Sequence, residues 1–156
     1  MRRRLLLCIL LAGCRAQPDD LSQRDGSEKG LIVDKLNEAV YQVLSSEEFR
    51  EIDGSKFYGP GANQGGAKYY VSTLPRDRVL ELLSEAIDPF VEGQPWADDY
   101  GQYHGAFNLK EDRTMQFAIG VSYLKPKARV FESSPEIVNN YESDIVYTPP
   151  YRWKGP

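Results

Sequence analysis

The chain has 156 residues, of which 41% are apolar and 12% aromatic, so it has enough material for the core of one domain. It carries 23 acidic against 19 basic side chains, a formal charge of −4, which excludes nucleic acid as an electrostatically favoured partner. Its single histidine, His104, and its two cysteines, Cys8 and Cys14, offer no transition-metal spacing and no nucleophile–histidine pair, so we expect no metal and no cofactor.

The first fourteen residues, MRRRLLLCILLAGC, have the pattern of an export signal. Arg2, Arg3 and Arg4 form a basic end, the run Leu5–Leu11 is apolar, and two small residues follow it. A membrane-spanning helix needs about 20 apolar residues. We therefore expect a secretory signal peptide that is removed, rather than a retained transmembrane anchor.

The end of this segment, Leu11-Ala12-Gly13-Cys14, resembles the lipobox of bacterial lipoproteins. The resemblance implies that residues 1–13 are removed and that Cys14, the new first residue, carries a diacylglyceryl group on sulfur and an acyl chain on nitrogen. Two or more acyl chains anchor a protein stably to a membrane. The alternative is an ordinary signal peptide with an incidental cysteine.

The lipobox also implies a location in the cell envelope. In Gram-negative lipoproteins an aspartate after the cysteine commonly favours the inner membrane, and this chain has Arg15 there. We therefore expect the periplasmic side of the outer membrane in a Gram-negative cell, and the outer face of the cytoplasmic membrane otherwise. Loss of three arginines with residues 1–13 lowers the formal charge from −4 to −7, so attachment would depend on the lipid.

Residues 14–29 are polar and charged and predict a flexible, lipidated linker. From Gly30 to about Ile52, apolar residues recur at steps of three and four, which indicates an amphipathic helix whose last part, 45–52, forms a separate short turn. A second amphipathic helix is predicted from Pro75 to Ile87. The glycine-rich stretch 54–66 between them lacks the GK[ST] ending of a phosphate-binding loop and predicts a mobile connection.

The clearest strand pattern is a hairpin of residues 103–109 and 114–124. In its second arm apolar residues alternate with small and polar ones, which is typical of a half-buried antiparallel strand. Ala118 and Gly120, on the face opposite the apolar residues, leave room for close approach by a helix or a partner. Two further strands are predicted at 67–72 and 128–132 and a short helix at 135–141, and the trailing segment 144–148 is a candidate for a last strand.

We therefore predict an α+β fold with two helices on a small, largely antiparallel four-stranded sheet. The domain is expected to span residues 30–148 and to be followed by an extended C-terminal tail, 149–156. No second domain and no internal repeat are indicated.

Residues 89–104 hold the candidate ligand- or partner-binding side chains. One hypothesis is an aromatic platform for cell-wall glycan, and the alternative is a loop that caps the core. A second hypothesis is an enzyme that uses His104 with Asp98 or Asp99, although adjacent carboxylates are usually solvated. The calcium-loop pattern is absent from this stretch. The candidates are Trp96, Asp98, Asp99, Tyr100, Tyr103 and His104.

The favoured functional prediction is a membrane-anchored envelope lipoprotein whose domain binds another protein without catalysis. Such a role would be of the immunity or inhibitor type, or would serve envelope assembly, and no motif selects between them. The alternatives are the glycan-binding lipoprotein and, ranked last, the enzyme. An exposed Trp96 in a strip of tyrosines would favour glycan, whereas a flat surface patch would favour a protein partner.

Overall fold

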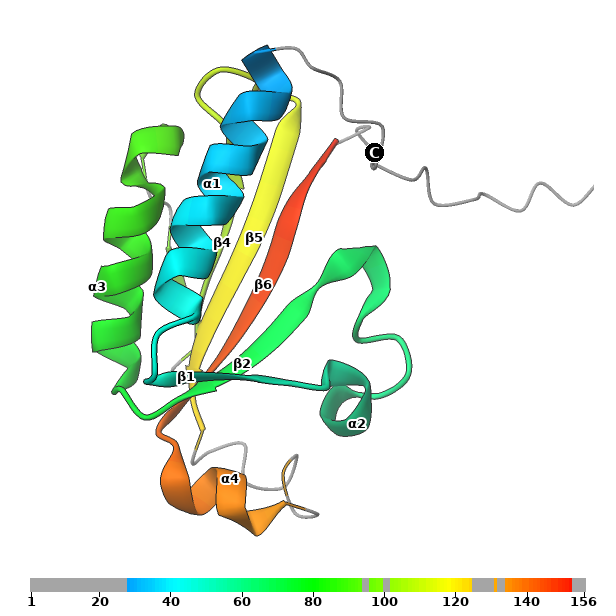
Figure 1. The fold of residues 1–156 in the computed structure, drawn as a ribbon, viewed down its shortest axis with the longest axis vertical. Coiled ribbons are helices and arrows are strands. Elements are labelled where there is room, and N and C mark those ends of the chain that lie inside the picture. The colour runs from blue at the N-terminus through cyan, green and yellow to red at the C-terminus, as the bar shows by residue number, and fades with distance from the viewer. Residues whose placement is uncertain (1–27, 94–95, 100–101, 125–130, 132–133, 153–156) are drawn as a thin grey trace, which may run out of the picture.

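The computed structural model describes residues 28–93, 96–99, 102–124, 131 and 134–152. Its strands form one six-stranded sheet in the order β1-β2-β6-β5-β4-β3, and every neighbouring pair is antiparallel (Figure 1). The elements are α1 (Glu28–Leu44), β1 (Phe49–Ile52), α2 (Gly54–Tyr58), β2 (Lys68–Ser72), α3 (Arg76–Ile87), β3 (Ala97–Asp99), β4 (Gln102–Asn108), β5 (Met115–Tyr123), α4 (Pro135–Asn140) and β6 (Ser143–Arg152), with short 3-10 turns at Gln64–Gly66 and Asp88–Phe90.

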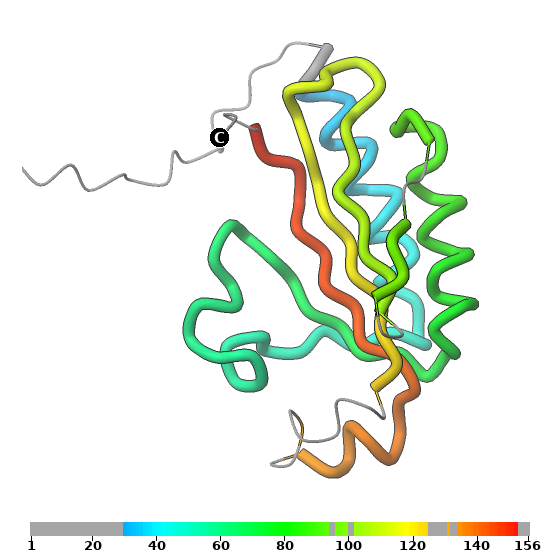
Figure 2. The backbone as a smooth tube through the Cα atoms, turned by 180° about the vertical axis from the view of Figure 1, so that it is seen from behind, coloured from blue at the N-terminus to red at the C-terminus, as the bar shows by residue number. Residues whose placement is uncertain are grey.

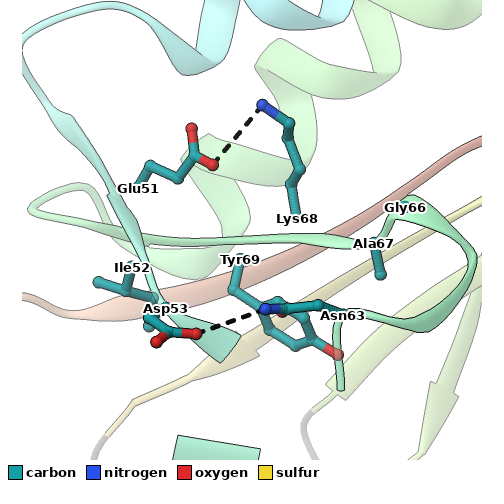
Figure 3. A pocket seen from close by; sticks show the side chains of 8 residues that line it. All are labelled: Glu51, Ile52, Asp53, Asn63, Gly66, Ala67, Lys68 and Tyr69. Carbon is teal, nitrogen blue, oxygen red and sulfur yellow. Dashed lines mark hydrogen bonds and ion pairs between the residues drawn. The ribbon is translucent and has the colours of Figure 1, made fainter. Parts of the chain in front are cut away.

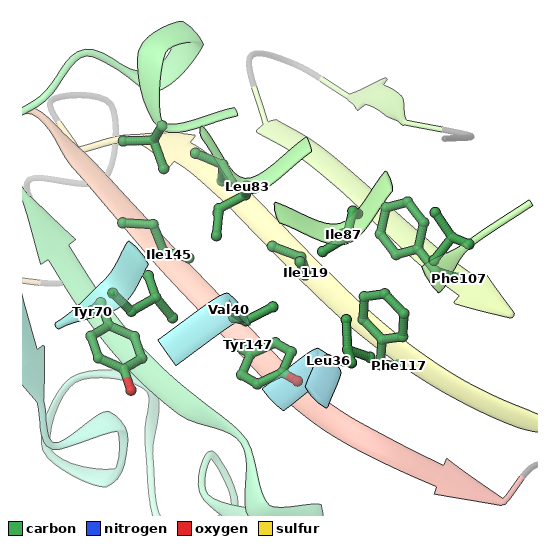
Figure 4. Close-up of a cluster of buried hydrophobic side chains, with 14 of the residues drawn as sticks. Leu36, Val40, Tyr70, Leu83, Ile87, Phe107, Phe117, Ile119, Ile145 and Tyr147 are labelled. Carbon is green, nitrogen blue, oxygen red and sulfur yellow. The ribbon is translucent and has the colours of Figure 1, made fainter. Parts of the chain in front are cut away.

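Helices α1 and α3 lie side by side on one face of the sheet (Figure 1). Each helix buries one stripe, because residues four positions apart fall on the same helix face. The sheet contributes large apolar side chains to the same core (Figure 4). The buried stripes are Leu36, Val40 and Leu44 in α1, and Val79, Leu83 and Ile87 in α3; the sheet adds Tyr70, Phe107, Phe117, Ile119, Val121, Ile145 and Tyr147.

This helix-covered face accounts for most of the stabilising burial. The ring of Phe107 stacks on that of Phe117, with centroids 5.1 Å apart. Burying one such side chain stabilises the fold by roughly 1.5–3 kcal/mol. The phenol of Tyr147, also fully buried, donates a hydrogen bond of 2.6 Å to Oδ1 of Asn37 in α1, so the polar group is satisfied inside the core.

A smaller cluster lies at the other face of the sheet, at the end where β2 and β5 meet α2 and α4. Val71 and Leu124 of the sheet region pack there against Phe131 and Ile137. The rings of Phe57 and Phe131 contact each other with centroids 5.0 Å apart. Segments outside the sheet therefore bring the bulky side chains that cover this part of it.

The segment between β1 and β2 is held to the sheet through tyrosines. The hydroxyl of Tyr58 in α2 donates a hydrogen bond of 2.7 Å to Oδ2 of the buried Asp144. Its ring stacks on Tyr69 of β2, with centroids 5.1 Å apart. The Tyr69 ring lies so close to Gly54 that a Cβ there would be 2.2 Å from it, which explains why a glycine follows the helix cap at Asp53.

The predicted four-stranded sheet with two helices is wrong, since the structure has six strands and four α-helices in the described residues, although it is an α+β fold. One cause is β1. The sequence favoured a short helical turn at 45–52, but Phe49–Ile52 pairs with β2 and buries Phe49 against the helix-side core. A four-residue run is too short for periodicity to separate a strand from a helical turn.

The second cause is β3, which lies in a segment expected to be an irregular loop. Ala97–Asp99 is exposed and acidic and has no strand pattern of its own. Its pairing with β4 is a tertiary effect at the edge of the sheet. Charged residues on a short edge strand also oppose edge-to-edge association.

The last strand, β6, runs beyond the predicted 144–148 to Arg152, and so into the segment expected to be a tail. Pro149 and Pro150 suggested a strand end, because proline cannot donate a ladder hydrogen bond. The structure tolerates them because β2 pairs with β6 only as far as Tyr147, and beyond that point β5 is the only described strand paired with β6. The register also shifts opposite these prolines, between Gln116 and Ala118.

Several predicted elements are confirmed. The two long helices, the strand at 67–72, the hairpin and the short helix after Pro135 all occur close to their predicted bounds. The strand predicted at 128–132 lies outside the described residues except for Phe131, which is buried. Among the described helices, none combines the length and the apolarity needed to cross a membrane.

Candidate functional site

The predicted site residues lie on two different sides of the sheet. Trp96 is on the helix side, partly buried, where its ring meets that of Phe107 edge-on with centroids 5.0 Å apart. Asp98 pairs with Tyr103 across β3 and β4, and both also lie on the helix side because Tyr103 alternates with the buried Phe107 along β4. The tryptophan therefore packs against the core.

Asp99 and His104 are on the opposite side of the sheet. The strand neighbours of the exposed His104 are Ala97 and Gly120, neither of which offers a carboxylate or a hydroxyl. Tyr100 lies outside the described residues. The described candidates therefore do not converge on one point, and within the described parts of the chain no three His, Cys, Asp or Glu side chains gather closely enough to hold a metal ion.

Tyr103 has a structural partner that the sequence did not reveal. The guanidinium of Arg76, at the start of α3, lies between the rings of Tyr103 and Tyr123 and is 4.3 Å from each centroid. Its Nε donates a hydrogen bond of 2.8 Å to Oδ1 of Asp77. This stack ties the start of α3 to β4 and β5, since a buried cation between two aromatic faces is favourable. Its members are far apart in sequence, so no local pattern could have shown it.

The uncovered side of the sheet forms a surface that we call the open face. Paired residues on neighbouring strands point to the same side, so the register identifies its members. The pairs His104–Gly120, Ala106–Ala118 and Asn108–Gln116 join β4 to β5, and Gly120–Val146, Ala118–Thr148 and Gln116–Tyr151 join β5 to β6. The open face comprises Gln102, His104, Ala106, Asn108, Gln116, Ala118, Gly120, Val146, Thr148 and Tyr151, each at least partly exposed.

The chemistry of the open face is distinctive. None of its ten residues is Asp, Glu, Lys or Arg, in a chain that is 27% charged. Its middle is a floor of small residues, Ala106, Ala118 and Gly120, and amides and hydroxyls surround this floor. Charged groups adjoin the open face at the two ends of β4, where Asp99 pairs with Gln102 and the ion pair Glu92–Arg113 lines a small pocket with Ala106 and Asn108. Two of the amides bond to each other, with Nε2 of Gln116 donating to Oδ1 of Asn108 at 2.7 Å.

Figure 2 shows this side of the sheet from behind, with the strands β4, β5 and β6 running side by side. The lower end of the sheet meets α4 and the segment that carries α2, where the second apolar cluster lies. None of the described helices crosses the upper part of these three strands. The open face is therefore the part of the sheet that the described chain does not cover.

A pocket of about 530 Å³ lies where β1 and β2 diverge (Figure 3). Its charged groups are partnered within the pocket. Nζ of Lys68 is 3.6 Å from Oε1 of Glu51, and Nδ2 of Asn63 donates to Oδ1 of Asp53 at 3.4 Å. Hydrogen bonds from Ser55, first from its hydroxyl, lower the pKa of Asp53 and keep it ionised as the cap of α2. These contacts describe a folded turn, and we assign no ligand to it.

Comparison with known proteins gives no relatives: no family model, no curated protein and no solved structure matches this chain.

Sequence reasoning found part of the open face and missed the rest. The alternation in β5 showed Ala118 and Gly120 opposite the apolar residues, and the same alternation in 102–108 could have added His104 and Ala106. The contribution of β6 could not be predicted, because Pro149 and Pro150 indicate the end of a strand, whereas β6 continues to Arg152.

Proposed function

We propose that this protein is a lipoprotein of the bacterial envelope, anchored through Cys14, and that its domain is a non-catalytic module that binds another protein through the open face. The anchor rests on the lipobox Leu11-Ala12-Gly13-Cys14. The role would be inhibition of an envelope-acting protein or assembly of an envelope complex.

The observation that carries the binding proposal is the absence of charge from the open face. Centres of protein–protein interfaces are depleted in charged residues and enriched in tyrosine and other aromatic residues. The outer surface of α3 shows the usual alternative, because its exposed residues, Asp77, Arg78, Glu81 and Glu85, are all charged. A surface that contacts only water would be expected to carry charged residues, as the exposed surface of α3 does.

The placement of the candidate residues favours this role over the two alternatives. A glycan platform needs aromatic rings that lie exposed for stacking, but the Trp96 ring packs against Phe107. An enzyme that used His104 would need an orienting carboxylate or a nucleophile beside it, but Asp98 is on the other side of the sheet. Asp99 is on the same side as His104 but pairs with Gln102, and the direct strand neighbours of His104 are Ala97 and Gly120. Both alternatives therefore lack a supporting geometry.

The anchor can be tested separately from the binding role. Metabolic labelling with a palmitate analogue should mark the full-length protein, and the Cys14→Ala variant should not be labelled. Labelling of Cys14→Ala at the level of the wild type would contradict the lipoprotein proposal.

The binding role is tested by a crosslinking pull-down of the tethered protein from its native envelope. We expect one protein to be recovered with the wild type and lost with Ala118→Arg, which places a long cation in the middle of the open face. The matched control is Gln42→Arg, which adds the same charge to the exposed surface of α1 and should leave recovery unchanged. Equal recovery with Ala118→Arg would contradict the proposal, as would recovery of no protein at all.

A further inference from the structure

We infer that the partner contacts the open face with a single amphipathic α-helix that lies along β5. This inference rests on the proposed binding role and specifies the shape and chemistry of the partner. It follows from the dimensions of the open face and from the size of the side chains on its floor.

The dimensions match one helix. Three strands about 4.8 Å apart give a width of roughly 14 Å, and Gln102–Asn108 gives a length of about 23 Å at ~3.3 Å per residue. An α-helix with its side chains is about 10–12 Å wide, and about 14 residues of it span 21 Å. The uncovered area of roughly 300 Å² therefore accommodates a single helix of about four turns.

A second copy of this chain does not suit the same surface. A stable dimer of two folded domains buries about 800 Å² on each copy, more than twice the area of the open face, whereas a partner that docks a single helix makes a smaller and weaker contact. The chain has a formal charge of −4, so two copies also repel each other, and the uncharged open face offers no ion pairs to offset that repulsion. The occupant is therefore a different molecule with a small contacting element.

The floor specifies the chemistry of that helix. Layers that pack on a sheet lie about 10 Å from it, and side chains must fill this space. Ala106, Ala118 and Gly120 fill little of it, so the occupant must supply large apolar side chains. The lower end of the same side shows this arrangement within the chain, where Phe57 and Ile137 from α2 and α4 fill the space over the sheet.

The border of the open face specifies the flanks of the helix. The amides of Asn108 and Gln116 and the hydroxyls of Thr148 and Tyr151 can exchange hydrogen bonds but cannot form ion pairs. The contacting helix is therefore expected to carry an apolar stripe at steps of three and four residues, bordered by uncharged polar residues such as Gln and Ser. Over the middle of the open face a charged flank would lose hydration without gaining a counter-charge, because the charged neighbours lie at the two ends of β4. These neighbours are Asp99 beside Gln102 and the Glu92–Arg113 pair beside Asn108.

The test uses a synthetic peptide as the probe. It is a helix-forming peptide of about 14 residues with one leucine stripe and glutamine flanks, and its control has the same composition except for two central prolines, which prevent a helix. The peptides are titrated into the isotope-labelled full-length protein, and backbone amide shifts are recorded by NMR. We expect the helical peptide to shift the amides of Ala106, Ala118, Gly120 and Thr148, and the proline peptide to shift none.

Substitutions make the readout specific. Ala118→Arg should weaken binding of the helical peptide by about tenfold or more, and Gln42→Arg should leave it within about twofold. Equal binding of the proline peptide, or shifts that map to another surface, would overturn the helix inference. If no peptide binds while the envelope pull-down still recovers a protein that depends on Ala118, the helix inference is wrong and the proposed function stands. If the pull-down recovers nothing, the proposed function itself fails.

Discussion

The two sides of the sheet differ although they are built from the same strands. In β5 the side chains facing α1 and α3 include Phe117, Ile119 and Val121, whereas the open face receives Gln116, Ala118 and Gly120. The first set is large, apolar and buried by the chain's own helices. The second is small and uncharged, and no described helix covers it. One alternating strand thus contributes to the core on one side and, on the other, to the open face that we propose as the binding surface.

If the proposed function holds, stability and binding depend on different residues of the same strands. Substitutions on the helix-covered face should lower the stability of the fold, and substitutions on the open face should leave stability nearly unchanged and alter binding. The predictions below test this separation, most of them by comparing one residue on each side of the sheet.

The largest effect is expected for Phe117→Ala. It removes a fully buried ring from contact with Phe107 and leaves a cavity, which costs about 3–5 kcal/mol of unfolding free energy. Its neighbour Gln116 faces the open side, and Gln116→Ala should cost less than about 1 kcal/mol because its hydrogen bond to Asn108 is exposed. Urea denaturation of both variants measures the difference, and similar losses would contradict the separation.

The next effect concerns two glycines on opposite sides. A Cβ at Gly105 would lie 2.4 Å from the Phe107 ring, which is held between Phe117 and Trp96, so Gly105→Ala should cost about 1–3 kcal/mol. At Gly120 the nearest atom, Nε2 of Gln102, would be 3.4 Å away. Gly120→Ala should therefore change stability by less than about 0.5 kcal/mol, as thermal unfolding can show.

A pH-dependent effect belongs to the covered face. Burial raises the pKa of Tyr147 well above that of a free tyrosine, so the phenol stays neutral in the folded protein. The unfolded chain ionises near pH 10, so this contribution is fully present below pH 10 and is lost above it, at up to about 1.4 kcal/mol per pH unit. Tyr147→Phe should reduce the fall in stability between pH 9 and about 11. An unchanged fall would show that Tyr147 does not stay neutral when folded.

At neutral pH the same substitution has a smaller effect. Tyr147→Phe removes the hydrogen bond to Asn37 and should cost roughly 1 kcal/mol, while Tyr151→Phe on the open face should be close to neutral. If the double variant Tyr147→Phe, Asn37→Leu regains stability, the cost of Tyr147→Phe comes from the amide of Asn37 that it leaves unpaired. An equal cost for Tyr151→Phe would show that the open face also contributes to the fold.

Local sequence pattern predicted the elements that carry their own signal. The apolar stripes of α1 and α3 and the alternation of β5 extend over enough residues to identify the first two as helices and the third as a strand. The strands β1 and β3 have only four and three residues, and their conformation comes from pairing with β2 and β4. Because of Pro149 and Pro150, the predicted β6 is shorter than the observed strand. Proline is tolerated in this part of β6 because β2 does not pair with it beyond Tyr147.

The candidate site was predictable only in part, because it also depends on which strands and helices lie next to each other in the fold. Alternation showed that Ala118 and Gly120 lie opposite the core, but it could not show that β4 and β6 flank them or that no described helix covers them. The aromatic signal of Trp96 was ambiguous, because burial against Phe107 and stacking on a ligand demand the same residue type.

The central claim is that the open face, and not the helix layer, meets a partner. A photoreactive phenylalanine placed in turn at Ala106, Ala118 and Thr148, and at the exposed Gln42 and Glu85 of the helix layer, tests it in the native envelope. We predict one discrete crosslinked protein at all three open-face positions and none at the two helix positions. Crosslinks at Gln42 or Glu85 without any at Ala118 would contradict the account.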